Sequence, residues 1–381
     1  MATRLEPTDG PSSVAAPQGG TMKAVVQEGT GSADVLHLRE VDRPTLTDDR
    51  VLIRVRAASV NALDWHTTHG GFLLNVISML MRQKNLPIRG VDVAGVVEAV
   101  GKNVTGLQPG DEVFGLGRGT FAEYASCLER GLLQKPKELS FTQAAAVGVA
   151  GLTALQGLRD KGQLRPGQRV LIHGAGGGVG TFAVQIAKAL GAHVTAVTGP
   201  KNVDLVRALG PDEIIDYTKE DVTRRAQRYD VVFDVAATRP IGTMRRVLTP
   251  NGMFVQAGAS KSGWLAVFGR ILALVVRSRV LGQRVVMYIS TTSRADLAVL
   301  RELIEAGKLR PVIDRTFPLT EAAEAVPTSG AGRRAPRSSS RSTESWGLGW
   351  CLLRHKPLSR RTALAMRTNA DSTAAASPSS M

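Results

Sequence analysis

The chain has 381 residues, of which 43% are hydrophobic and 21% charged, so it fits two domains with a sizeable core and is not an intrinsically disordered chain. It contains two cysteines, Cys127 and Cys351, which excludes a disulfide scaffold and indicates a reducing, cytoplasmic location. The formal net charge is +15, but no basic run interleaved with aromatic residues supports a nucleic-acid partner.

The N-terminal segment and the most apolar segment bear on secretion and on membrane insertion. Residues 1–21 are rich in Pro, Gly, Ser and Thr and lack the apolar core of a signal peptide, so we expect a disordered extension. The most apolar stretch, Trp264–Ile289, is interrupted by four arginines. A spanning helix needs about 20 nearly uninterrupted apolar residues, so we expect no membrane span.

The first half of the chain reads as mostly β. β-Branched or alternating runs punctuated by Gly and Pro predict strands at Met22–Gln27, Val51–Ala58, Val91–Val100 and Asp111–Phe114. The apolar segment Phe72–Met81 predicts a helix near a cleft. We therefore expect one mostly β domain over residues 22–145.

After residue 145 the pattern changes to alternating helices and strands. Helices are predicted over Ala144–Leu158, Thr181–Leu190 and Asn202–Leu209, and strands over Arg169–His173, His193–Thr198, Glu213–Tyr217, Asp230–Val235 and Met253–Ala257. Such alternation requires a doubly wound parallel sheet of the Rossmann type, expected over residues 146–290. A helix at Arg294–Ala306 and a strand at Pro311–Phe317 then return the chain to the first domain over residues 291–326.

A glycine-rich turn, Gly174-Ala-Gly-Gly-Gly-Val-Gly180, directly follows the first strand of this alternation and opens a helix. In that context backbone N–H groups and a helix N-terminus face a pyrophosphate without intervening side chains. The best alignment of the dinucleotide-binding pattern uses Ala175, Gly177 and Gly180, with Gly178 and Val179 between the last two. The alternative is an ordinary tight turn.

The end of the next strand bears on the choice of cofactor. NAD-binding proteins typically place an acid there for the ribose hydroxyls, whereas this chain has Thr198-Gly-Pro-Lys201-Asn202. A hydroxyl and an ammonium suit a 2′-phosphate, and Tyr217 ends the following strand nearby. We therefore expect NADPH, with the alternative that Lys201 is a solvated residue at a helix start.

Several ordered motifs together resemble the medium-chain dehydrogenase/reductase superfamily, in its zinc-free quinone-oxidoreductase-like branch. They are Asn61-Ala-Leu-Asp64, Gly90-Val-Asp92-Val-Ala-Gly95-Val, Gly106-Leu-Gln-Pro-Gly-Asp-Glu-Val-Phe114, Ala122-Glu-Tyr-Ala125 and the Ala-rich segment before the glycine turn. The resemblance spans residues 22–326. It implies a GroES-like catalytic domain beside a Rossmann domain, NADPH-linked reduction of quinones or activated alkenes, and a homodimer.

The resemblance also implies which residues face the reaction. Asn61 and Thr153 match positions beside the nicotinamide, and Gly258 matches a backbone contact to its amide. As alternatives, Asn61 is a turn residue and Thr153 a helix cap. Asp64 and Asp92 are expected to tie loops together rather than to catalyse.

Zinc chemistry is not expected. A catalytic zinc site needs three protein ligands, and zinc-dependent relatives have Cys where this chain has Asn61 or Ala62, and Gly-His-Glu where it has Gly90-Val91-Asp92. His66 and His69 lack a third ligand and are read as loop or helix-face residues. The apolar segments Phe72–Met81 and Trp264–Val276 predict a small-molecule substrate that is large and flat or lipophilic, or alternatively an interdomain core.

Two departures from the family pattern complete the expectations. Gly148 stands in a segment where relatives have Pro, and should loosen the domain junction. After Val326 the final helix and strand of relatives are replaced by a basic, Ser-rich sequence, and a one-base change of reading frame permits Gly-Ala-Lys-Val-Val-Ile-Thr from Arg334. The alternative is a genuine low-complexity tail, and on either account we expect residues 327–381 to be an aberrant, disordered or poorly packed tail.

That tail leaves two alternatives to the leading function. One is an impaired or non-catalytic NADPH-binding relative whose catalytic domain has lost its last strand through a frameshift, which would expose a sheet edge. The other is a binder of nucleic acid or acidic surfaces acting through the tail, which carries eight Arg and one Lys against two acids.

Overall fold

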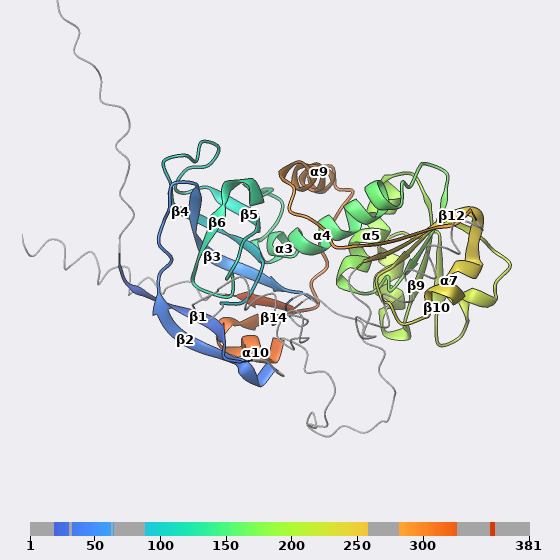
Figure 1. Cartoon of the computed structure of the whole chain (residues 1–381), viewed down its shortest axis with the longest axis horizontal. Helices are drawn as coiled ribbons and strands as arrows, with labels where there is room; N and C mark the ends of the chain where they lie inside the picture. The colour runs from blue at the N-terminus through green and yellow to red at the C-terminus, as the bar shows by residue number, and fades with distance from the viewer. Residues whose placement is uncertain are drawn as a thin grey trace, which may run out of the picture.

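The structure is a computed structural model that describes residues 19–29, 33–61, 64, 88–257 and 282–325, together with the backbone of residues 351–354. The expectations for residues 1–18, for Phe72–Met81, His66, His69, Gly258 and Trp264–Val276, and for most of the C-terminal tail lie outside the described residues. Figure 1 shows a β-rich lobe and a second lobe built on a twisted sheet, with α4 and α9 between them.

The β-rich lobe contains a two-stranded and a seven-stranded sheet. The small sheet pairs β1 (Thr21–Gln27) with β2 (Leu36–Asp42) in antiparallel fashion. The large sheet has the order β14-β15-β3-β4-β5-β7, with β6 paired to β3. Its members are β3 (Arg50–Val60), β4 (Asp92–Val100), β5 (Glu112–Leu116), β6 (Tyr124–Leu128), β7 (Leu132–Gln134), β14 (Arg315–Pro318) and β15 (Cys351–Arg354).

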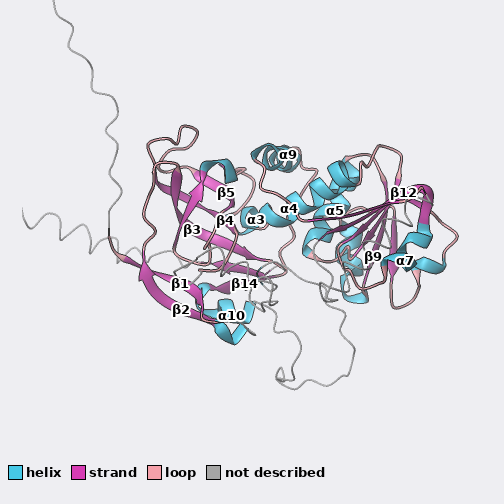
Figure 2. Ribbon diagram, viewed as in Figure 1, coloured by secondary structure: helices cyan, strands magenta, loops and turns pink. Residues whose placement is uncertain are grey.

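The second lobe holds a parallel six-stranded sheet in the order β10-β9-β8-β11-β12-β13. The strands are β8 (Arg169–His173), β9 (His193–Thr198), β10 (Glu213–Asp216), β11 (Tyr229–Asp234), β12 (Leu248–Ala257) and β13 (Arg284–Tyr288). Counted along the chain this order is 3-2-1-4-5-6, the Rossmann arrangement. The α/β fold class with two different sheets is thus confirmed, and Figure 2 shows the contrast between the lobes.

Helices cover the parallel sheet and join the lobes. They are α3 (Phe141–Ala145), α4 (Gly148–Leu155), α5 (Gly178–Ala189), α6 (Val203–Ala208), α7 (Ile241–Met244), α9 (Arg294–Glu305) and α10 (Ala322–Ala325). Short 3-10 turns connect several of them, and a π-helical turn at Gln156–Lys161 follows α4. One buried cluster includes Phe114 of β5, Leu152 of α4 and Phe182 of α5, so the core continues from one lobe into the other.

Strands β8 and β9 have the bounds predicted from sequence. The predicted helix Ala144–Leu158 is instead divided into α3, α4 and the π-helical turn, because the backbone around Gly148 is engaged by a buried carboxylate described below. Strands β2, β6, β7 and β13 were not predicted. In particular, β13 lies at the end of a stretch that the sequence marked only as apolar.

The expectation of a disordered tail and an exposed sheet edge is corrected at four residues. Cys351–Arg354 forms β15, which pairs in parallel with β14 and antiparallel with β3 from Ala57 to Val60. The hydrogen-bonding edge of β3 that a missing last strand would leave open is therefore occupied by this segment. The domain limits 22–145, 146–290 and 291–326 remain a proposal that agrees with the sheet topology.

Candidate functional site

The glycine-rich turn lies between β8 and α5. The N–H groups of Gly174 and Ala175 donate to the carbonyl of Val197 at 3.1 and 2.9 Å, which anchors the turn to β9. Helix α5 begins at Gly178 with Gly177 as its N-cap, so the N–H groups of Gly178, Val179 and Gly180 have no acceptor within the helix. N–H groups in this arrangement are suited to an anion, and the binding of a pyrophosphate by these three residues stays a prediction.

Two glycines keep this turn free of side chains. A Cβ at Gly180 would lie 2.1 Å from the carbonyl oxygen of Gly174 and 2.7 Å from Cα of Ala175. A Cβ at Gly176 would lie 2.6 Å from Oγ1 of Thr198 and 2.6 Å from Cβ of Asn202. The sequence pattern treated Gly176 as a free position, yet it makes the closest approach to the end of β9. This cradle, which a Cβ would fill, fits a dinucleotide pyrophosphate.

Thr198, Lys201 and Tyr217 surround the end of β9. Thr198 is buried, whereas Lys201 and Tyr217 are exposed. The N–H of Tyr217 donates to the carbonyl of Thr198 at 3.1 Å, and a Cβ at Gly199 would lie 2.8 Å from the Tyr217 hydroxyl. The structure thus brings these three predicted residues to one edge of the sheet, beside the glycine-rich turn. Asp216, the last residue of β10, pairs in register with Thr198, and its Oδ1 accepts hydrogen bonds from the N–H and the hydroxyl of Thr218 at 3.0 and 2.8 Å.

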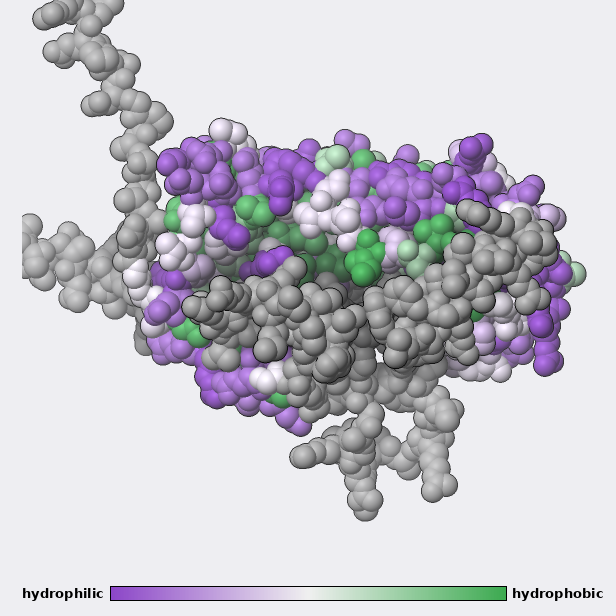
Figure 3. Space-filling model, viewed as in Figure 1, coloured by the Kyte–Doolittle hydropathy of each residue, from purple (hydrophilic) through white to green (hydrophobic). Residues whose placement is uncertain are grey.

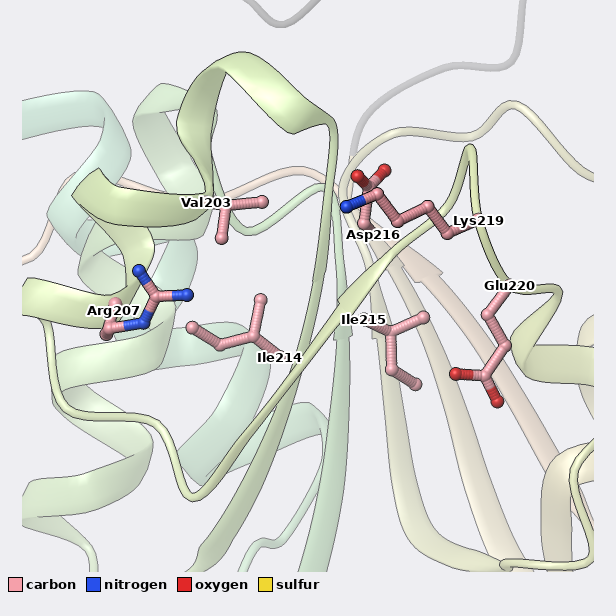
Figure 4. Close-up of a pocket in the computed structure, with 7 residues that line it drawn as sticks. All are labelled: Val203, Arg207, Ile214, Ile215, Asp216, Lys219 and Glu220. Atoms are coloured by element: carbon pink, nitrogen blue, oxygen red, sulfur yellow. The ribbon is translucent and has the colours of Figure 1, made fainter.

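A pocket of about 280 Å³ lies next to this edge, between α6 and β10 (Figure 4). It is lined by Val203, Arg207, Ile214, Ile215, Asp216, Lys219 and Glu220. Its two cations are balanced by its two carboxylates, so the pocket offers no net positive charge to a phosphate. Thr198 and Lys201 therefore remain the residues predicted to meet a 2′-phosphate, and this pocket adds nothing to that prediction.

A buried His–Asp pair lies beneath the turn and was missed by sequence reasoning. Nδ1 of His173, the last residue of β8, lies 2.8 Å from Oδ1 of Asp234, the last residue of β11. The same oxygen accepts from the N–H groups of Ala236 and Ala237 at 3.1 and 2.9 Å. Strands β8 and β11 flank the point where the strand order reverses, which is where Rossmann sheets bind ligands. The pair therefore fixes the loop that follows β11 against the turn.

A second buried cluster holds Asn61 at the end of β3. The Asn61 N–H donates to Oδ2 of Asp64 at 2.8 Å, and its Nδ2 donates to Oδ2 of Asp92 at 2.9 Å and to the carbonyl of Ser59 at 3.3 Å. Burial raises the pKa of the Asp92 carboxyl to about 8, while the hydrogen bonds from Asn61 and Val149 oppose the shift. Burial likewise raises the pKa of Asp64 to about 6.

One continuous hydrogen-bonded chain joins Asn61 to the second lobe. Oδ1 of Asp92 accepts from the N–H of Val149 at 2.8 Å. The carbonyl of Val149 in turn accepts from Oγ1 of Thr153 at 2.6 Å, and Oγ1 of Thr153 lies 2.9 Å from Oγ of Ser290, just beyond β13. The two residues assigned to the nicotinamide from sequence are thus connected through the first turn of α4.

The directions of these bonds decide what each side chain can offer. Thr153 has one hydroxyl hydrogen, which goes to the Val149 carbonyl, so Ser290 donates to Thr153. The two hydrogens on Nδ2 of Asn61 are donated to Asp92 and to the Ser59 carbonyl. No described residue donates a hydrogen bond to Oδ1 of Asn61. Neither Asn61 nor Thr153 has a donor left for a substrate carbonyl. They offer acceptors instead.

The expectation that Gly148 loosens the domain junction is wrong. A Cβ at Gly148 would lie 2.3 Å from Oδ1 of Asp92 and 3.2 Å from the carbonyl oxygen of Gly115. The glycine therefore lets a buried carboxylate of β4 reach the backbone of α4. It tightens the contact between the catalytic strands and the helix that leads into the second lobe.

The donor set at the position of a catalytic zinc does not fit the metal. Among the described residues no group of three or more His, Cys, Asp or Glu side chains could hold one. Val91 is apolar, and both oxygens of Asp92 accept hydrogen bonds from N–H groups. A carboxylate engaged in this way would have to release Asn61 and α4 before it could bind a cation.

The face of the molecule in Figure 3 adds information about the substrate side. Hydrophobic side chains gather in a depression in the middle of this face, between the two lobes, and hydrophilic ones line the outer rim. Ile289, between β13 and Ser290, is 78% exposed. In the described part of the chain no helix is both long enough and apolar enough to cross a membrane.

Comparison with family models matched two parts of the chain. Residues 47–137 match the family described as alcohol dehydrogenase GroES-like domain. Residues 209–335 match the family described as zinc-binding dehydrogenase.

Similar full-length proteins were found among curated proteins and solved structures. The chain is 33% identical over 322 residues to a chloroplastic quinone oxidoreductase of Triphysaria versicolor, covering 81% of this chain and 94% of the relative. It is 35% identical to a chloroplastic NADPH-dependent alkenal/one oxidoreductase of Arabidopsis thaliana, covering 80% and 75% of the two chains. The quinone oxidoreductase structure from Coxiella burnetii aligns with a TM-score of 0.74 and 27% identity, covering 88% of this chain and all of that one.

Proposed function

This chain belongs to the quinone-oxidoreductase-like branch of the medium-chain dehydrogenase/reductase superfamily, and from that membership we propose that it is an NADPH-dependent, zinc-independent oxidoreductase. The proposed reaction transfers a hydride to a quinone or to an α,β-unsaturated carbonyl compound. Names of relatives that include quinone and alkenal/one oxidoreductases support this substrate class. The exposed Ile289 and the hydrophobic depression support a lipophilic small-molecule substrate.

The proposal of NADPH as the cofactor rests on the side chains that surround the end of β9. A pyrophosphate on the N–H groups of Gly178, Val179 and Gly180 places the adenosine ribose near the end of the second strand of the sheet. The side chains gathered there include a hydroxyl, an ammonium and a phenol, from Thr198, Lys201 and Tyr217. The nearby Asp216 carboxylate accepts from Thr218 through Oδ1. The hydroxyl, ammonium and phenol favour a ribose that carries a 2′-phosphate. A free 2′-hydroxyl is instead typically bound by an acidic side chain, which accepts the hydrogen bond that the hydroxyl donates.

The residues of this chain would divide the work as follows. The bound nicotinamide supplies the hydride. Asn61 and Thr153 present acceptors and would orient the nicotinamide end, while Gly258, outside the described residues, matches the family's backbone contact. No donor is left on Asn61 or Thr153 to polarise the substrate, so the proton at the end of the reaction is assigned to solvent.

Zinc independence is proposed from the chemistry of the donor set. By the family resemblance, the positions of zinc ligands are those of Asn61 or Ala62, Val91 and Asp92. The polar atoms of Asn61 and Asp92 hold each other and α4. We also propose a cytoplasmic location, from the scarcity of cysteine, and a homodimer, from the family. Relatives include proteins named as chloroplastic and mitochondrial, so the location needs a direct test by fractionation of the expressing cells.

Cofactor choice is tested by titrating the full-length protein with NADPH and NADH, followed by nicotinamide fluorescence. We expect tighter binding of NADPH. The Lys201→Ala variant should lose about tenfold in NADPH affinity, the effect of one charge-assisted hydrogen bond, with NADH binding unchanged. The matched control is Lys219→Ala, an exposed lysine of the neighbouring pocket. Equal loss in both variants, or a preference for NADH, would contradict the assignment.

Turnover is tested separately with a panel of quinones and enones, with and without a metal chelator. Reduction that persists in the chelator supports a zinc-independent reaction, and loss of activity in chelator refutes it. Binding of NADPH without turnover on any member of the panel would favour the impaired, non-catalytic relative instead.

A further inference from the structure

Asp92 has a place in the site that the proposed function does not explain. Its carboxylate is fully buried and accepts from two different elements, Oδ2 from Nδ2 of Asn61 at 2.9 Å and Oδ1 from the N–H of Val149 at 2.8 Å. It lies at the start of β4, and neither partner lies on that strand. A buried carboxylate is costly unless hydrogen-bonded, so the arrangement needs both partners to keep their places.

Asp92 also decides which end of the Asn61 amide faces outward. An amide has a donor end and an acceptor end, and the neighbours determine its orientation. With a carboxylate oxygen and the Ser59 carbonyl both beside one end, that end must be Nδ2. The Oδ1 end is then the one available to a ligand, and Asn61 as a whole is 9% exposed.

We propose that Asp92 is a positioning residue, which holds the Asn61 amide so that its carbonyl oxygen accepts a hydrogen bond from the carboxamide N–H of the nicotinamide. The inference rests on the proposed function, because it takes Asn61 to lie beside the nicotinamide. It adds the direction of the hydrogen bond and names the residue that imposes it. The same carboxylate binds the first turn of α4 through the N–H of Val149. Helix α4 also carries Thr153, so Asp92 fixes the position of Thr153 relative to Asn61.

The protonation state of Asp92 decides the pH range in which this role applies. Burial raises its pKa to about 8, and the charged group that acts on it is Asp64, which raises the pKa further. Arg89 in turn lowers the pKa of Asp64. Above pH 8 the carboxylate accepts from Asn61. Below pH 8, Asp92 is protonated, and a proton on Oδ2 can donate to Asn61. That bond opposes the orientation in which Nδ2 of Asn61 faces Asp92.

The substitution Asp92→Asn tests the direction of the bond while keeping the shape of the side chain. Asn at position 92 must still accept from the N–H of Val149, so its NH₂ faces Asn61. Asn61 is then driven to turn its Oδ1 inward and present Nδ2. The double variant Asn61→Asp with Asp92→Asn exchanges the two groups, and Asp at position 61 again presents an acceptor.

The decisive readout is the binding of two cofactors by calorimetry at pH 9 in the full chain. One is NADPH and the other is its 3-acetylpyridine analogue, which keeps the carbonyl but lacks the N–H donors. The wild type should prefer NADPH by about tenfold, the loss of one hydrogen bond. Asp92→Asn should abolish that preference, and the exchanged double variant should restore it. At pH 6.5 the wild-type preference should weaken, and that of Asp92→Asn should not change.

A matched control is available on the surface. Nδ2 of Asn103 donates to Oδ1 of Asp49 at 2.7 Å, the same pair of groups in an exposed position. Asp49→Asn should leave the cofactor preference unchanged. Thermal unfolding of each variant shows that it is folded, and a structural effect alone would weaken both cofactors equally without changing their ratio.

The outcomes separate this inference from the function on which it rests. If the wild type binds neither cofactor, the proposed function fails. If it binds NADPH and the ratio of the two affinities is the same in wild type and Asp92→Asn, the positioning role of Asp92 is overturned while the function stands.

Discussion

Replacing Gly148 with Ala should destabilise the protein, although alanine is the better helix former. The new Cβ would lie 2.3 Å from Oδ1 of Asp92, which is closer than any real Cβ contact. The neighbour is a buried carboxylate held by Asn61 as well as by Val149, so it has no free side to which it can move. We expect the bond between Asp92 and the N–H of Val149 to break.

The magnitude follows from two opposed terms. At pH 9 the Asp92 carboxyl is ionised, and a hydrogen bond to a charged group contributes about 1.5–3 kcal/mol. Gly→Ala in a helix gains at most about 1 kcal/mol. Gly148 is the first residue of α4, where that gain is smaller. The free energy of unfolding should therefore fall by about 1–2 kcal/mol.

Urea denaturation at pH 9, followed by circular dichroism, measures this change. The matched control is Gly242→Ala in α7, where a Cβ would meet nothing within 4 Å, and which should be neutral or slightly stabilising. A Gly148→Ala variant as stable as Gly242→Ala would refute the argument, because the glycine would then not be needed for the approach of Asp92.

Three other predictions concern single groups. Asp92 has a pKa of about 8 in the folded protein against an ordinary value of 3.8, so the folded state holds the proton longer and stability should fall as pH rises, by up to about 1.4 kcal/mol per pH unit. Between pH 7 and 8, where Asp64 is mostly ionised, Asp92→Asn should flatten this slope in urea titrations; an unchanged slope would rule out Asp92 as its source. Gly180→Ala should reduce NADPH affinity at least about tenfold, because the Cβ meets only backbone of the turn; normal binding in a fluorescence titration would contradict the placement of the pyrophosphate. Burial raises the pKa of Cys127 to about 12, so this thiol should not react with a disulfide reagent at pH 8 until the protein is unfolded. Peptide mapping locates the label, and rapid labelling of Cys127 in the native state would show that β6 opens.

The sequence determined the parts of this protein that depend on local pattern. The strands β8 and β9 have the predicted bounds, because a buried parallel strand is a short apolar run bounded by turn residues. The glycine-rich turn was placed before α5 for the same reason. Ordered motifs in the first half were enough to indicate the family and its two sheets.

Only the tertiary structure decided the contacts between residues distant in the chain. Nothing local in Asp234 indicates that it meets His173, which lies 61 residues away, since the pair exists only because β8 and β11 are neighbours in the sheet. The role of Gly148 was predicted with the wrong sign, because its reason is a carboxylate on β4.

The C-terminal segment shows the same limit. A short run such as Cys351–Arg354 has no signal strong enough to stand out in a basic, Ser-rich sequence. Its pairing partners, β3 and β14, supply the backbone hydrogen bonds that make it a strand. Local pattern thus determined which elements form, and the packing of distant elements decided which polar groups meet at the site.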